Sequence, residues 1–152
     1  MTAFESVDAL LDFAIEKEEE ANKFYIDLAG KMDREAMRKV FEGFAAEEAK
    51  HKEKLMGVKE GKQLMPVEQK ITDLKIGDYL VDVAPNKEMD YQEALIVAMK
   101  KEKASFKLYT DLATTTEDGN IKSLMLGLAQ EEAKHKLRLE IEYDEFFLTE
   151  AY

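Results

Sequence analysis

Glutamate and histidine occur together in this sequence at spacings that suit the coordination of metal ions. The segments Glu48–His51 and Glu132–His135 both read Glu-Ala-Lys-His, which puts a carboxylate and an imidazole three residues apart. On a helix these two side chains share one face and lie about 4.5 Å apart along the axis, so the glutamate can bridge two ions while the histidine binds one. Two further glutamates lie on other predicted helices. The candidate metal ligands are Glu18, Glu48, His51, Glu102, Glu132 and His135.

The sequence around these residues is apolar. Steps of three and four residues keep side chains on one helical face, and the stripe through Glu18 also contains Ala14, Tyr25 and Leu28. Unpaired carboxylates in a dry core are strongly unfavourable or take up protons, and no Lys or Arg lies on any of the four stripes. Two divalent cations would balance the four carboxylates in formal charge.

Two tyrosines accompany the candidate ligands. Tyr25 and Tyr109 follow Glu18 and Glu102 by two helical turns on the same faces. Their hydroxyls can hydrogen-bond a ligand carboxylate, which would fix its orientation towards a metal. Core filling by a tyrosine with a satisfied hydroxyl is an equally good interpretation.

A different interpretation of the pattern is a metal-free bundle whose glutamates face water. A single Glu-x-x-His pair on a charged helix is most often exposed, and a duplication copies a surface motif as readily as a metal site. Glu47 and Glu131 are also repeated but lie one step off the stripes, so we predict that both face the solvent. The metal site is favoured because all six candidates, including both histidines of the chain, lie on apolar stripes.

The helices that must position these residues arise from an internal duplication. Residues 14–55 align without a gap to residues 98–139, at an offset of 84, and 17 of the 42 aligned pairs are identical. Each half reads as two long helices joined by a short turn. We therefore predict an all-α, single-domain four-helix bundle with hairpins at 6–56 and 90–141, a crossover at 57–89 and a helical tail at 142–152.

Capping residues predict where the helices begin. Ser6 and Asp33 are the expected N-caps of the first and second helices. Asp90 and Glu93 have the spacing of a capping box at the start of the third helix. A structureless crossover of this length is unusual in a compact domain, so a short helix is expected at residues 71–81.

Composition limits what else the protein can be. Hydrophobic residues make up 45% and charged residues 36% of the chain, which fits a globular domain, and there is no cysteine for disulfides, iron–sulfur clusters or thiol nucleophiles. The net charge of −11 disfavours nucleic acid and membranes as partners. Residues 1–13 do not form a secretory signal and no apolar run reaches spanning length, so we expect a cytoplasmic protein.

Four motifs of this chain resemble those of the rubrerythrin group of the ferritin-like superfamily, over about residues 6–147. The motifs are Glu18 with Tyr25, Glu48–His51, Glu102 with Tyr109, and Glu132–His135. The resemblance implies a ferritin-like bundle of two helical hairpins joined by a long crossover, with the six candidates as ligands of two iron ions. Manganese or a mixed pair would suit the same ligands, and zinc can replace them.

The sequence departs from that family in two respects. Rubrerythrins proper carry a rubredoxin-type iron site held by four cysteines, and this chain has none, so it would need an external electron donor such as a rubredoxin. They also carry an additional glutamate one turn after the third-helix ligand, where this chain has Ser105. This difference argues against the family's redox-linked movement of one iron, and the ligand set is nearer to bacterioferritin-like sites.

The resemblance implies redox chemistry at the metal pair. Reduction of hydrogen peroxide, as a defence against oxidative stress, is the leading hypothesis. Oxidation and handling of iron with O2 is the alternative, and a metal-free helical interaction module is the second alternative. We also expect a homodimer, because apolar residues off the stripes, such as Phe13, Phe24 and Phe106, would form a second packing face or a subunit interface.

Overall fold

In a computed structural model of the chain, residues 6–62 and 89–148 are described, and they are almost entirely helical. The elements are α1 (Val7–Gly30), α2 (Glu35–Lys62), α3 (Tyr91–Thr114), α4 (Gly119–Tyr143) and the π-helical turn η2 (Asp144–Leu148). No strand occurs among the described residues. The all-α prediction is therefore confirmed.

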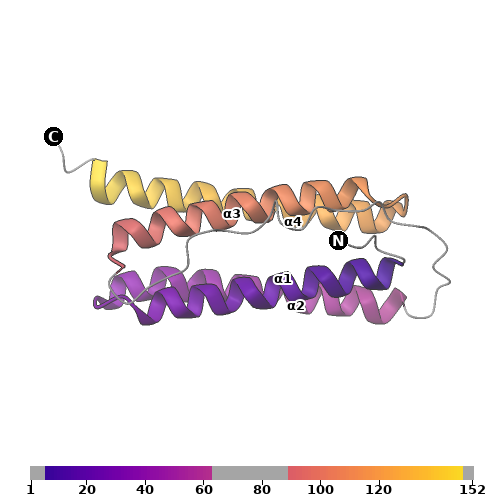
Figure 1. Cartoon of the computed structure of the whole chain (residues 1–152), viewed down its shortest axis with the longest axis horizontal. Helices are drawn as coiled ribbons and strands as arrows, with labels where there is room; N and C mark the ends of the chain where they lie inside the picture. Colours follow the sequence, from indigo (N-terminus) through magenta and orange to yellow (C-terminus); the bar gives the residue numbers. More distant parts are fainter. Residues whose placement is uncertain (1–5, 63–88, 149–152) are drawn as a thin grey trace.

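The helices pair as two antiparallel hairpins that lie along each other (Figure 1). α1 packs along α2, and α3 packs along α4, with contacts between α1 and α3 joining the hairpins. The middle of each helix comes to the same level of the bundle in this arrangement. The short helix predicted at residues 71–81 lies outside the described residues.

Three helices begin at side chains that satisfy their free backbone N–H groups. The hydroxyl of Ser6 accepts from the backbone N of Ala9 at 3.0 Å, and the carboxylate of Asp118 caps α4 in the same way. At the start of α3, the Asp90 side chain accepts from the backbone N of Glu93 at 2.8 Å, and the Glu93 side chain accepts in return. The predicted caps at Ser6 and Asp90 are confirmed.

The second helix differs from its predicted limits at both ends. It begins at Glu35, so Asp33 lies one residue too early to be its N-cap. It continues to Lys62, past the predicted end of the hairpin at residue 56 and through two glycines. Leu55 is fully buried and Val58 packs on the same cluster, so burial on the helix's inner face offsets the low helix propensity of the glycines.

The core consists of two apolar clusters, one towards each end of the bundle. The first includes Leu11, Ala14, Leu55, Leu112, Met125 and Leu128. The second includes Leu28, Phe41, Phe44, Leu95, Ala98 and Leu139. In every helix the candidate ligands fall between the residues of these two clusters, so the sequence stripes bring all six to one level and enclose them in apolar material on both sides.

The C-terminal segment packs back on the bundle up to the last described residues. Phe146 and Phe147 of η2 and Tyr143 contact the second cluster, and the rings of Tyr91 and Phe146 lie 5.1 Å apart in an edge contact. The Tyr91 hydroxyl donates to Glu142 at 2.7 Å. The predicted tail is thus helical as far as η2, and this part of it packs on the body of the bundle.

Several large apolar side chains remain on the surface. Phe13 and Phe24 are partly buried against the clusters, whereas Phe106 is 37% exposed and Ile26 and Leu137 are each 56% exposed. None of the described helices is apolar enough over a sufficient length to cross a membrane. The homodimer stays a prediction.

Removing the capping box of α3 should destabilise the protein measurably. We expect Asp90→Ala to lower the free energy of unfolding by about 1 kcal/mol, because a backbone N–H at the helix start loses its acceptor. Urea unfolding of the metal-free protein measures this. Lys100→Ala, an exposed change in the same helix, is the control, and equal effects of the two variants would contradict the assignment.

Candidate metal centre

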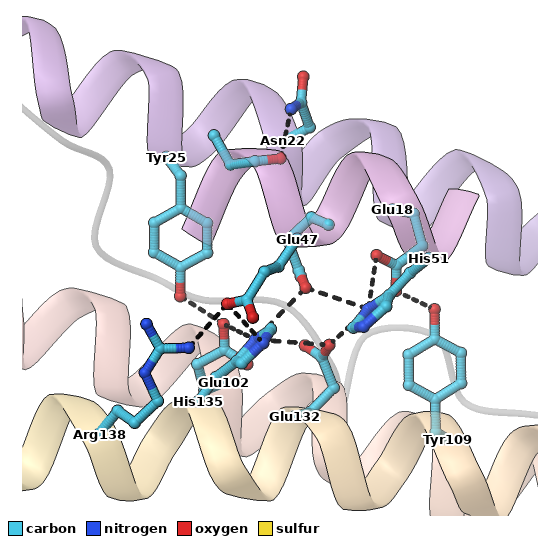
Figure 2. Close-up of polar contacts among 12 residues, drawn as sticks. Glu18, Asn22, Tyr25, Glu47, His51, Glu102, Tyr109, Glu132, His135 and Arg138 are labelled. Atoms are coloured by element: carbon cyan, nitrogen blue, oxygen red, sulfur yellow. Dashed lines mark hydrogen bonds and ion pairs between the residues drawn. The ribbon is translucent and has the colours of Figure 1, made fainter. Parts of the chain in front are cut away.

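All six candidate ligands are buried and converge in the interior of the bundle. Figure 2 labels all of them except Glu48, between the two hairpins. His51 retains 9% of its surface and the other five retain 2% or less. They come from all four helices: Glu18 from α1, Glu48 and His51 from α2, Glu102 from α3, and Glu132 and His135 from α4. The alternative in which the glutamates face water is therefore wrong for these positions.

The six residues form two overlapping four-residue groups of potential ligands, beside a third group of Glu48 and the two histidines. The first group is Glu18, Glu48, His51 and Glu132, and the second is Glu48, Glu102, Glu132 and His135. In each group, one ligand atom from every residue lies within 4.8 Å of the others. Glu48 and Glu132 belong to both groups, so their carboxylates can each contact two ions, as the spacing predicts.

Both imidazoles turn Nδ1 towards the carboxylates. Nδ1 of His51 lies 3.4, 3.2 and 3.1 Å from oxygens of Glu18, Glu48 and Glu132. Nδ1 of His135 lies 3.5, 3.6 and 3.9 Å from oxygens of Glu48, Glu102 and Glu132. The two rings are nearly parallel, with centroids 5.6 Å apart. Each histidine thus directs one nitrogen at the glutamates of its four-residue group.

The polar atoms of this cluster lack hydrogen-bond partners to an unusual degree. Buried polar atoms in proteins are nearly always paired. Of the nine buried side-chain N and O atoms without a partner among the described residues, all but one belong to the six ligands, and the exception is Asp8. Unpaired carboxylate oxygens and imidazole nitrogens that converge are the donor set that transition-metal dications accept, so the residues fit a pair of such ions.

Burial and the neighbouring charges favour bound protons on Glu48, Glu132 and the two histidines when no cation is bound. Burial raises the pKa of Glu48 from 4.5 to about 7, with repulsion from Glu18 adding to the effect while the contact with His51 opposes it. The pKa of Glu132 rises further, through burial and the neighbouring glutamates. Burial lowers the pKa of His51, but the adjacent carboxylates outweigh this and raise it from 6.5 to about 10.

The tyrosines cross between the hairpins. The hydroxyl of Tyr25 in α1 donates to Oε1 of Glu102 in α3, and the hydroxyl of Tyr109 in α3 donates to Oε1 of Glu18 in α1 (Figure 2). Both tyrosines are buried, and burial together with the nearby carboxylates raises their pKa, so they stay protonated and act as donors. The prediction that each binds a candidate ligand is confirmed, but the bonded glutamate is in the other half of the repeat.

One residue of the site was assigned wrongly from the sequence. Glu47, predicted to face water, has a side chain that is only 36% exposed; its Oε2 lies 3.1 Å from Nε2 of His135 and accepts from Arg138 at 2.8 Å. Its repeat partner Glu131 is 47% exposed and pairs with Lys134, as expected for a surface residue. The sequence signal that could have indicated this role of Glu47 is Arg138, because the equivalent position in the first half of the repeat holds Lys54.

Comparison with known proteins gives one family and two similar structures. The family model for rubrerythrin matches residues 9–88 and 93–152. A hypothetical protein from Pyrococcus furiosus is 29% identical, with 91% of this chain and 89% of that chain covered and a TM-score of 0.66. A protein from Thermotoga maritima, named as a ferritin-like diiron-carboxylate protein, is 22% identical over 95% of this chain and 99% of that one, with a TM-score of 0.73. The second likeness shows the fold alone, and no curated protein matches.

The stability of the metal-free protein should fall as the pH rises. Folding raises the pKa of Glu48 from 4.5 to about 7, so its protonated form stabilises the fold fully below pH 4.5, and this stabilisation is lost as the pH passes about 7. Folding raises the pKa of His51 from 6.5 to about 10, so its contribution is complete below pH 6.5 and is lost as the pH passes about 10. Bound cations displace these protons, so the stabilisation by metal should increase over the same range.

Urea unfolding at a series of pH values, with and without metal, measures both trends. The variant Glu48→Gln should show a shallower decline than the native chain, because an amide does not titrate there. A metal-free protein that becomes more stable between pH 5 and 9 would contradict the protonation of this cluster.

Proposed function

Because the chain belongs to the rubrerythrin family, we propose that it is a di-iron redox protein that reduces hydrogen peroxide with electrons from an external donor. The observation that carries the proposal is the pair of overlapping ligand groups that share Glu48 and Glu132. A shared carboxylate on each side suits two ions held close together. The diiron-carboxylate description of the Thermotoga maritima protein supports iron as the metal.

Two ions suit the stoichiometry of this reaction. Reduction of one peroxide molecule to two water molecules consumes two electrons and two protons. When bound, a ferrous pair would supply both electrons, one from each ion. Four carboxylates also match the formal charge of two ferrous ions, so the loaded centre is neutral apart from any bound substrate.

The side chains of this protein set the position and surroundings of the metals. Tyr25 and Tyr109 hold the carboxylates of Glu102 and Glu18 by hydrogen bonds from buried hydroxyls. The apolar clusters on both sides limit access of water, which strengthens the electrostatic interactions within the centre. A fixed, water-poor ligand set favours redox change without loss of the metals.

The electrons must come from a separate redox centre. The chain has no cysteine, so none of its residues can form a rubredoxin-type iron site. We therefore propose an external donor protein such as a rubredoxin, which docks and reduces the centre between turnovers.

Ser105 is half-buried one turn after Glu102, where it cannot act as a carboxylate ligand.

Anaerobic stopped-flow mixing of the ferrous protein with hydrogen peroxide, and separately with O2, tests the proposal. We expect rapid oxidation by peroxide with one peroxide consumed per pair of ions, and slower oxidation by O2. Faster oxidation by O2 would favour iron oxidation and handling as the function. The proposal fails if neither oxidant acts.

The matched variants are Glu48→Ala, at a shared ligand, and Glu42→Ala, at an exposed position of the same helix. Glu48→Ala should lose bound iron and the peroxide reaction, and Glu42→Ala should keep both. Elemental analysis of protein purified without added metal gives the iron content. Absence of metal from the native chain, with stability unchanged or raised in Glu48→Ala, would support a metal-free interaction module instead.

A further inference from the structure

We propose that Glu47 and Arg138 position His135 and so make the two metal positions unequal, with the His135 position the tighter of the two. This inference rests on the proposed di-metal centre and concerns residues outside its ligand set. It implies that the position bound by His51 is the one from which a metal exchanges first.

Contacts around His135 form a chain that ends at the surface (Figure 2). Nη1 of Arg138 donates to Oε2 of Glu47 at 2.8 Å, and this same oxygen lies 3.1 Å from Nε2 of His135. A carboxylate that accepts the Nε2 proton leaves the lone pair on Nδ1, the atom directed at the other ligands, and makes that nitrogen a stronger base. The contact between Glu47 and Nε2 of His135 does not have hydrogen-bond geometry in this structure, but at 3.1 Å the carboxylate is placed to favour the imidazole tautomer that binds metal.

Phe44 fixes the same arrangement from the side. The guanidinium of Arg138 lies over its ring, 4.7 Å from the centroid, and the ring of His135 meets it edge-on at 5.2 Å. Phe44 is buried, so it offers a rigid surface for both side chains. An arginine restrained in this way holds the Glu47 carboxylate against His135 at a small further cost in side-chain entropy.

The other half of the repeat lacks this arrangement. The position equivalent to Glu47 is Glu131, but those equivalent to Arg138 and Phe44 are Lys54 and Leu128. Glu131 pairs with Lys134 at 3.7 Å, and no described carboxylate pairs with Nε2 of His51. The side chain of His51 is 11% exposed against 2% for His135. Carboxylate oxygens thus lie near both ring nitrogens of His135, and near only Nδ1 of His51 among the described residues.

Anaerobic titration of the metal-free protein with Co2+, followed by calorimetry and visible absorption, tests the inference. We expect two binding steps in the native chain, with His135→Ala removing the tighter and His51→Ala the weaker. Glu47→Gln should weaken the tighter step about 10- to 100-fold and leave the weaker one unchanged. Its matched control, Glu131→Gln, should change neither step.

A variant that binds Co2+ more tightly distinguishes positioning of a histidine from a general loss of stability, because a destabilised protein would bind the metal more weakly. The double variant Lys54→Arg with Leu128→Phe supplies the missing partners to Glu131, and it should strengthen the weaker step. Two equal steps in the native chain, or equal effects of Glu47→Gln and Glu131→Gln, would overturn the inference while leaving the di-metal centre intact. Binding of fewer than two Co2+ ions by the native chain would instead remove the proposed function on which it rests.

Discussion

Repulsion among four carboxylates in a water-poor core is the constraint on which this structure depends. Glu18, Glu48, Glu102 and Glu132 converge between two apolar clusters, and the ion pairs that they form within residues 6–62 and 89–148 are with histidines. Such charges must be cancelled by bound protons or by cations. The same side chains are therefore a source of instability when ionised and alone, and a strong binding site when cations are present.

The helices meet this constraint by enclosing the carboxylates rather than by pairing them with basic residues. Long hairpins place apolar residues above and below the ligands, and Tyr25 and Tyr109 donate at the two boundaries of the polar layer. Even with these two donors, most carboxylate oxygens of the four glutamates have no hydrogen-bond partner. Neutral donors fix geometry without cancelling charge, so the demand for cations is preserved.

Periodicity and duplication predicted most of this arrangement, since both depend on local spacing. Stripes of three and four residues identified all six buried candidates, because an ionisable residue stands out within an apolar pattern. The partners of Tyr25 and Tyr109 could not be predicted, because they depend on how the hairpins lie against each other. Glu47 was missed for a related reason: its contacts with His135 and Arg138 are made to another helix.

The tyrosine contacts between hairpins and the shared carboxylates have an evolutionary consequence. Each hairpin supplies three of the four residues of one ligand group, one residue of the other group, and the tyrosine that donates to a glutamate of the opposite hairpin, so it is incomplete alone. Two identical hairpins related by a twofold axis would supply the full set, with both positions necessarily the same. Fusion of two gene copies into one chain releases that restriction, and the pair Arg138 and Lys54 is one of the positions at which the two halves have diverged.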